Sequence, residues 1–311
     1  MYKIIGNSKI WFIVSILLAV FGAAAILIFG LRISIDYKGG TVMELQTNNP
    51  SRVSIINETL RDREITSFQV KESGTNEVIV RMPAITNEKH ISTLSALKDK
   101  LGEATETKYD TVGPTVGRDL AKRSVIAVIL ASLAIIVYIA YAFRRLPRPL
   151  SPWIFGLSAV IALVHDLLIT TGMVALLGNF YHWMEVDVLF ITALLTIMGF
   201  SVHDTIVVYD RLRENFIRNP HKDIAVSTEE SANQTLVRSI NTSLTVLIVL
   251  VSLLLLGGES IRHFILTLII GMFVGTYSSI FVASPLIVVW HQRRAKASPV
   301  RSRFATSAHR A

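Results

Sequence analysis

The sequence has no cysteine among its 311 residues, which excludes disulfide bonds, thiolate metal sites and cysteine nucleophiles. Charge is also scarce: only 17% of the residues are Asp, Glu, Lys or Arg, whereas 51% are hydrophobic. A soluble globular domain usually has about 25% charged residues. No segment combines basic and aromatic residues as a nucleic-acid surface would, so no nucleic-acid partner is expected. The composition therefore indicates a membrane protein.

The net charge of +8 is unevenly distributed along the chain. Residues 32–119 contain 12 Lys or Arg and 13 Asp or Glu, a net charge of −1. The remaining residues contain 19 Lys or Arg and 10 Asp or Glu, a net charge of +9. The basic excess lies in short loops and at the ends of the chain, as expected for a membrane protein that follows the positive-inside rule.

Long apolar runs predict six transmembrane helices. These runs are Ile10–Leu31, Ser124–Phe143, Leu150–Gly178, Val188–Tyr209, Thr235–Gly257 and His263–Trp290. The first could instead be a cleaved signal peptide, since Ala23–Ala25 resembles a cleavage site. The run has 22 residues and continues past these alanines, which favours an uncleaved anchor. Residues 1–31 are thus interpreted as the N-terminus and first span.

Basic residues predict that both termini of this multi-pass membrane protein are cytoplasmic. Lys3 and Lys9 precede the first span, and Arg144, Arg145 and Arg148 follow the second. Residues 121–291 would form the remaining bundle, with a cytoplasmic loop at 210–233, and residues 292–311 a basic cytoplasmic tail that touches anionic lipid. One cluster departs from the rule, because Arg118, Lys122 and Arg123 lie at the outer end of the second span.

Residues 32–120 form a polar insert between the first two spans and are predicted to fold outside the cytoplasm. Strand patterns occur at Thr41–Thr47, Ser67–Glu72, Glu77–Met82 and Ala104–Thr111, and helix patterns at Pro50–Arg63 and Asn87–Leu101. Ser51 and Asn87 are the expected helix caps, and Ile91, Leu94, Ala96–Leu97 and Leu101 the apolar face of the second helix. The βαββαβ order predicts a ferredoxin-like α+β domain. The expected fold class is therefore a polytopic α-helical membrane protein with an extracytoplasmic α+β domain.

Asp204 lies within the apolar fourth span, where an ionised side chain costs about 2.5–3.5 kcal/mol. It therefore needs a partner, a proton or water. Arg238 interrupts the fifth span, on a stripe with Gln234, Asn241 or Thr242, and Thr245. Arg238 alone could reach the cytoplasmic surface by snorkelling. Its depth matches that of Asp204 on an antiparallel neighbour, which favours an ion pair. Small residues at Gly271, Gly275, Ser279 and Ala283 share one face of the sixth span and predict close helix packing.

His165 and Asp166 form a second titratable pair, in the third span. A structural hydrogen bond between helices is an equally good interpretation. A metal site with His203 and Asp204 is disfavoured, because no helix shows the i, i+4 ligand spacing of a helical zinc site. An intramembrane aspartyl protease would need Asp166 and Asp204 to share a proton, and the nearby Arg238 argues against that.

Several blocks of this sequence resemble the SecF family, the six-span subunits of the bacterial SecD–SecF complex, within the wider RND transporter group. They are Asp36–Gly40 (DYKGG), Gly113–Gly117 (GPTVG), His165–Asp166, Leu195–Asn215 (LTIMGFSVHDTIVVYDRLREN), Asn233–Leu247 (NQTLVRSINTSLTVL) and Gly271–Pro285 (GMFVGTYSSIFVASP). The family usually reads Gly-Tyr-Ser-x-Asn-Asp-Thr at the centre of the longest block, where this chain has Phe200 and His203. His203 therefore adds a titratable group beside Asp204.

The resemblance implies a non-enzymatic subunit of the bacterial cytoplasmic membrane that uses the proton motive force to assist protein export, without a cofactor. It implies that Asp204 and Arg238 conduct protons, with supporting positions at His203, Asp166, His165, Thr205 and Thr242. The implied partners are a SecD-like subunit, the Sec translocon with YajC, translocating preproteins and membrane lipid. The alternative is a scaffold that only stabilises a partner translocase chain.

Overall fold

The computed structural model describes residues 2–297, except for 66, 74–75, 145, 147–149, 182 and 259–260. The chain divides into two compact units. A helical unit comprises residues 1–32, 127–185 and the chain from 189 onward, and a sheet unit comprises residues 33–126 with 186–188. Of the expected tail, residues 292–311, the part from residue 298 onward lies outside the described residues.

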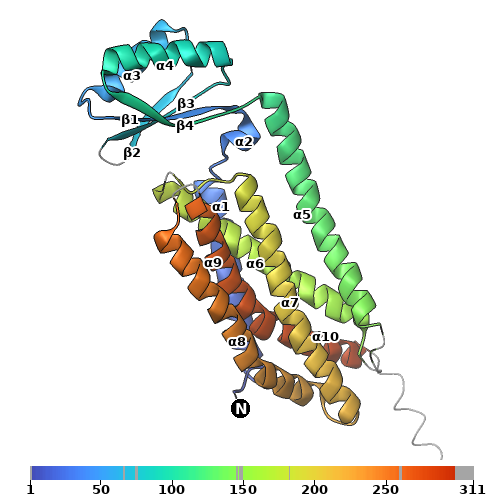
Figure 1. Ribbon diagram of the computed structural model, residues 1–311. Helices are drawn as coiled ribbons and strands as arrows, with labels where there is room; N and C mark the ends of the chain where they lie inside the picture. The colour runs from blue at the N-terminus through green and yellow to red at the C-terminus, as the bar shows by residue number, and fades with distance from the viewer. Residues whose placement is uncertain are drawn as a thin grey trace, which may run out of the picture. The chain divides into compact units, whose positions relative to one another are not determined.

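Six helices among the described residues are long and apolar enough to cross a membrane, as the apolar runs predict (Figure 1). Five are continuous: α1 (Ser8–Phe29), α5 (Pro114–Ala142), α6 (Pro152–Phe180), α7 (Val188–Arg218) and α8 (Ile224–Leu256). The sixth consists of α9 (Arg262–Ser278), a π-helical turn η2 (Ser279–Ala283) and α10 (Ser284–Ala297). A π turn inside an α-helix often occurs at a functional site.

The polar stretch predicted as a loop at 210–233 is mostly helical. α7 continues to Arg218 and α8 begins at Ile224, so residues 219–223 alone connect them. Glu214 stabilises the extension of α7 through ion pairs with Arg211 (2.5 Å) and Arg218 (2.6 Å), one turn away on either side. The Asp223 carboxylate caps α8 by accepting a hydrogen bond from the backbone N–H of Ala225. The polar residues after Tyr209 therefore mark where the apolar run ends, whereas the helix itself continues beyond them.

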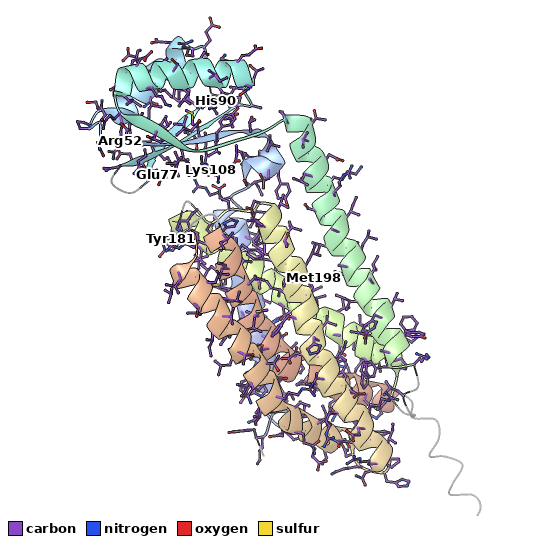
Figure 2. All side chains as sticks on the ribbon, in the orientation of Figure 1. Arg52, Glu77, His90, Lys108, Tyr181 and Met198 are labelled. Carbon is purple, nitrogen blue, oxygen red and sulfur yellow. The ribbon has the colours of Figure 1, made fainter. Side chains whose placement is uncertain are left out.

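Glycines allow the helices of the bundle to approach closely. A Cβ added at Gly172 of α6 would lie 2.3 Å from the Cα atom of Gly22 on α1. On α9, a Cβ added at Gly271 would clash with the Ile197 side chain of α7, and one added at Gly275 would lie 3.0 Å from Cβ of Ser201. The predicted small-residue face of the sixth span is therefore a packing face. The main apolar core includes Met198 of α7, which Figure 2 labels and which is fully buried.

The sheet unit has the predicted βαββαβ order. Its elements are α2 (Ile35–Lys38), β1 (Gly40–Thr47), α3 (Arg52–Asp62), β2 (Gln69–Ser73), β3 (Glu77–Met82), α4 (Asn87–Leu101) and β4 (Ala104–Val112). The strands form one antiparallel sheet in the order β2-β3-β1-β4. Helices α3 and α4 cover one face of it (Figure 1). Alternate residues of β3, Val78, Val80 and Met82, are buried in the core beneath these helices.

Three local predictions in this unit differ from the structure. Ser51 precedes α3 but makes no side-chain capping bond. Thr86 rather than Asn87 caps α4, because its hydroxyl accepts from the Lys89 N–H. Ile91 is 59% exposed, whereas the adjacent His90 (Figure 2) is buried, bonded to Glu106 (2.7 Å) and stacked on Tyr109. An aromatic contact with β4 therefore sets the buried face of α4, which its apolar residues alone did not predict.

Candidate functional site

Asp204 is a buried carboxylate in the middle of an apolar helix. Only 4% of the residue is exposed, and among the described residues its Oδ2 atom is buried without a hydrogen-bond partner. Ser239 of α8 faces Asp204 across the helix pair, near enough to interact with its carboxylate. The Ser239 hydroxyl is buried too, but within the described chain its geometry falls short of a hydrogen bond to Asp204 or to another group. An unpaired buried polar group costs about 1–3 kcal/mol. The α7–α8 contact therefore holds two polar groups whose hydrogen bonds are incomplete.

Arg238 and His203 are the cationic or titratable neighbours of Asp204. Both side chains are exposed, Arg238 on α8 beside Ser239 and His203 on α7 beside Asp204. In the part of the chain that the structure describes, no ion pair joins Arg238 to Asp204. The expected pairing is thus absent from this conformation, although the two charges are near enough to act on each other. Adjacent positions of an α-helix are about 100° apart around its axis, which lets Arg238 be exposed while Ser239 is buried.

The predicted polar stripe of α8 lies on an exposed face. Gln234, Arg238, Asn241 and Thr245 are all exposed. Thr242 is partly buried, but its hydroxyl donates to the carbonyl oxygen of Arg238 (2.9 Å) within its own helix. The sequence therefore identified this stripe correctly, but its residues do not face the core of this chain.

Asp166 of α6 is completely buried and forms hydrogen bonds with residues of α7 and α9. Its Oδ1 atom lies 3.0 Å from Nδ1 of His165. Its Oδ2 atom accepts hydrogen bonds from Ser201 of α7 (2.6 Å) and Ser278 of α9 (2.7 Å). Ser201 precedes Asp204 by three residues, which is about one helical turn. The predicted structural bond between helices therefore exists, and it lies next to the Asp204 site.

Thr205 belongs to a hydroxyl network at the π turn. Its hydroxyl lies 2.9 Å from the hydroxyl of Ser279, which also contacts the Ser201 carbonyl (3.1 Å). The Ser284 side-chain hydroxyl donates to the carbonyl oxygen of Ser279 (3.1 Å), at the end of the π turn. Thr205 thus links α7 to η2.

The geometry gives no support to a metal site or a shared-proton pair. Within the described ranges, no three His, Asp or Glu side chains gather as metal ligands. Both oxygens of Asp166 are bonded, to His165 and to the two serines, and the hydrogen bonds among the described residues include none between Asp166 and Asp204.

The two glycine-containing motifs of the sheet unit pack against each other. A Cβ at Gly39 (φ +74°) would lie 2.6 Å from Pro114 Cα, and one at Gly117 would lie 2.9 Å from the Tyr37 carbonyl oxygen. The Tyr37 hydroxyl donates to the Asp187 carbonyl (3.1 Å) and lies 3.0 Å from the Ser124 hydroxyl. Burial raises the pKa of Tyr37 above its ordinary value. Asp36 accepts a hydrogen bond from the N–H of Val188, the first residue of α7 (3.3 Å).

Sequence reasoning did not predict several of these contacts. Ser201, Ser239 and Ser278 are single small residues in apolar runs, and nothing in their spacing shows which helix each one faces. A second example is Glu229, whose carboxylate accepts hydrogen bonds from the backbone N–H groups of Ile4, Ile5 and Gly6. Glu229 lies in the polar first turns of α8, and nothing local in the sequence indicates its partners, because they are more than 220 residues away along the chain.

These features define a class: a multi-pass membrane protein with an α+β unit between its first two spans and buried carboxylates in its bundle. The family model described as protein export membrane protein SecD/SecF, C-terminal, matches residues 92–293. The chain is 41% identical to the protein translocase subunit SecF of Thermobaculum terrenum, over 91% of this chain and 92% of that protein. It is 38% identical to the SecF subunit of Anaerolinea thermophila, over 93% and 94% of the two chains.

The chain is also similar in fold to a crystal structure of SecDF, a translocon-associated membrane protein from Thermus thermophilus. Its TM-score with this chain is 0.79 at 34% identity, over 94% of this chain. The chain spans 39% of that longer protein. The chain belongs to the SecF family of protein translocase subunits, within the SecD/SecF family of protein export membrane proteins.

Proposed function

We propose that this chain uses the proton motive force to assist protein export, with Asp204 as the group that takes up and releases the proton. The observation that carries the proposal is a buried carboxylate in a spanning helix, whose Oδ2 atom has no hydrogen-bond partner among the described residues, with an exposed arginine near it on the next helix. Burial favours a neutral carboxyl group, and a nearby cation favours the ionised one. A small movement of α8 against α7 decides which influence is stronger.

The proposed cycle has two conformations. In the conformation described here, Arg238 is withdrawn and Asp204 holds a proton. When Arg238 approaches, Asp204 releases that proton and the two side chains form an ion pair. His203, absent from the usual family pattern, supplies a further proton acceptor beside Asp204 on the exposed side of α7. Thr205 and Thr242 support the site indirectly, since Thr205 holds α7 to η2 and Thr242 bonds the backbone at Arg238.

The energy available is sufficient to shift a conformational equilibrium. One proton moving down about 100 mV releases about 2.3 kcal/mol. Since 1.4 kcal/mol is a factor of ten, one proton changes an equilibrium constant about 40-fold. Val188 is the first residue of α7 and belongs to the sheet unit, so a displacement of α7 passes along the chain into that unit.

A SecD-like chain is the proposed partner. The Thermus thermophilus relative is a SecDF protein, of which this chain matches 39%. The exposed stripe of α8 carries Arg238 and Asn241, and polar groups of this kind are unfavourable against lipid. A second bundle that covers this stripe would remove the exposure. The Sec translocon with YajC, translocating preproteins and membrane lipid complete the proposed set of partners.

We place both termini in the cytoplasm and the sheet unit outside, because basic residues cluster in the corresponding loops and ends. We also assign the sheet unit a ferredoxin-like fold. Its support is the βαββαβ order together with the antiparallel strand order β2-β3-β1-β4, with both helices on one face.

Dissipating the proton gradient tests the proposal against the alternative of a passive scaffold. In membrane vesicles that contain the full chain and its partner, an ionophore should abolish this chain's contribution to export. A scaffold's contribution would survive the ionophore. Arg238→Lys keeps a cation but loses the planar fork of arginine, so export should be reduced without being lost, whereas Arg238→Gln should lose the gradient-dependent part entirely. Arg213→Gln, on the exposed end of α7, is the matched control and should have no effect.

A further inference from the structure

Three hydrogen bonds hold the Asp166 carboxylate in the bundle. Two serine hydroxyls, from Ser201 and Ser278, donate to its Oδ2 atom at 2.6 and 2.7 Å. This oxygen is therefore occupied as an acceptor. The remaining oxygen, Oδ1, faces Nδ1 of His165 at 3.0 Å, so one proton is shared between these two atoms. The residue is completely buried, and an ionised carboxylate there depends on these three donors.

His165 has a second nitrogen that none of these bonds uses. Its side chain is only 9% exposed, and within the described part of the chain the buried Nε2 atom has no hydrogen-bond partner. With Nε2 bare, the pair carries a charge of −1. With one more proton on Nε2, the imidazolium and the carboxylate sum to zero. Both charge states keep the Nδ1–Oδ1 bond and both serine bonds.

We infer that His165 and Asp166 form a second proton-binding site of the bundle, loaded and unloaded through His165 Nε2. This inference rests on the proposed proton coupling and extends it from one site to two. The proton that arrives at Nε2 changes the charge of the pair from −1 to zero, and its departure restores −1. No bond other than the N–H bond forms or breaks.

The two sites are connected through one turn of α7. Ser201, which binds Asp166, lies three residues before Asp204, about 4.5 Å along the helix axis.

Most of the charged and titratable groups on the elements that pack against this pair lie toward the ends of those elements. They are Lys9 on α1, Arg262 and His263 on α9, His291 and Arg293 on α10, and Asp210, Arg211, Arg213, Glu214 and Arg218 on α7. The titratable residues nearer the middle are His203, Asp204 and Tyr209 on α7 and Tyr277 on α9.

Isosteric substitutions separate a proton-binding role from a structural one. Asp166→Asn retains an oxygen that can accept from both serines and an amide that can donate to His165, but it does not titrate. His165→Asn keeps a donor near the Nδ1 position and removes Nε2. Both variants should lose the gradient-stimulated part of export in vesicles containing the full chain and its partner. Ser278→Ala, which removes one structural bond and leaves the titrating pair, should retain it.

Infrared difference spectra of the reconstituted full chain give an independent readout. Protonation of His165 Nε2 should shift the carboxylate band of the buried Asp166, and this shift should disappear in Asp166→Asn and persist in Asp204→Asn. Wild-type export by Asp166→Asn, or an unchanged shift in that variant, would show that the pair is structural. A loss in Ser278→Ala equal to that in Asp166→Asn would show the same. If Asp166→Asn fails to insert, His165→Asn decides alone. Normal export by Asp204→Asn would refute the proposed function itself.

Discussion

Replacing Gly172 by alanine tests how closely α1 and α6 must approach. The added Cβ would lie 2.3 Å from the Cα atom, 2.5 Å from the carbonyl oxygen and 2.7 Å from the carbonyl carbon of Gly22. All three are backbone atoms, so no side-chain rotation relieves the clash and the two helices must separate. Overpacking of this kind costs about 1–3 kcal/mol. Alanine is favoured over glycine in a helix by about 1 kcal/mol, which offsets part of that cost.

Gly199→Ala on α7 is the matched control, because a Cβ at Gly199 meets nothing within 4 Å. The helix-propensity gain is common to both variants. Their difference in free energy of unfolding, about 1–3 kcal/mol, therefore reports the packing cost alone. Denaturant unfolding of the two variants in the same detergent measures this difference. Equal stabilities would show that α1 and α6 do not cross as closely as the structure has them.

Two further changes test contacts at the ends of the bundle and in the sheet unit. Burial raises the pKa of Tyr37, so the tyrosine contributes stability below pH ~10 that is lost as the pH rises through the folded-state pKa. Tyr37→Phe removes the hydroxyl bonds, so it should lower the free energy of unfolding at neutral pH by about 1 kcal/mol and should abolish the loss of stability at alkaline pH. Thermal unfolding as a function of pH measures both effects. An unchanged loss at alkaline pH in this variant would contradict the assignment to Tyr37. Glu229→Ala leaves three backbone N–H groups of residues 4–6 without their acceptor, so hydrogen exchange there should quicken, whereas Glu230→Ala should leave it unchanged. Equal exchange in the two variants would refute the contact.

The sequence predicted the spans well because each is a continuous apolar run, which is the strongest signal a membrane imposes. It predicted β3 and α4 to the residue, since their patterns are bounded by turn residues. It placed the end of α7 and the start of α8 wrongly, because water can solvate a helix beyond the membrane and ion pairs such as Arg218–Glu214 then stabilise it.

The candidate site was predicted in its residues but not in its bonds. Asp204 and Arg238 were identified from the cost of charge in a membrane, which depends on composition alone. Whether they pair depends on the rotation of α8, and that rotation buries Ser239 and leaves Arg238 exposed. The bonds of Ser201 and Ser278 to Asp166 depend in the same way on how three helices pack, which a single sequence does not encode in any local pattern.

The central claim is that Asp204 carries the proton that drives export. Asp204→Asn preserves the size of the side chain and removes its ability to titrate, while Asp210→Asn makes the same change at an exposed position of the same helix. Protein export into vesicles is measured for both variants, with and without an imposed proton gradient. Asp204→Asn should insert and assemble normally but show no stimulation by the gradient, and Asp210→Asn should be stimulated like the unmodified chain. Full stimulation of Asp204→Asn would contradict the account.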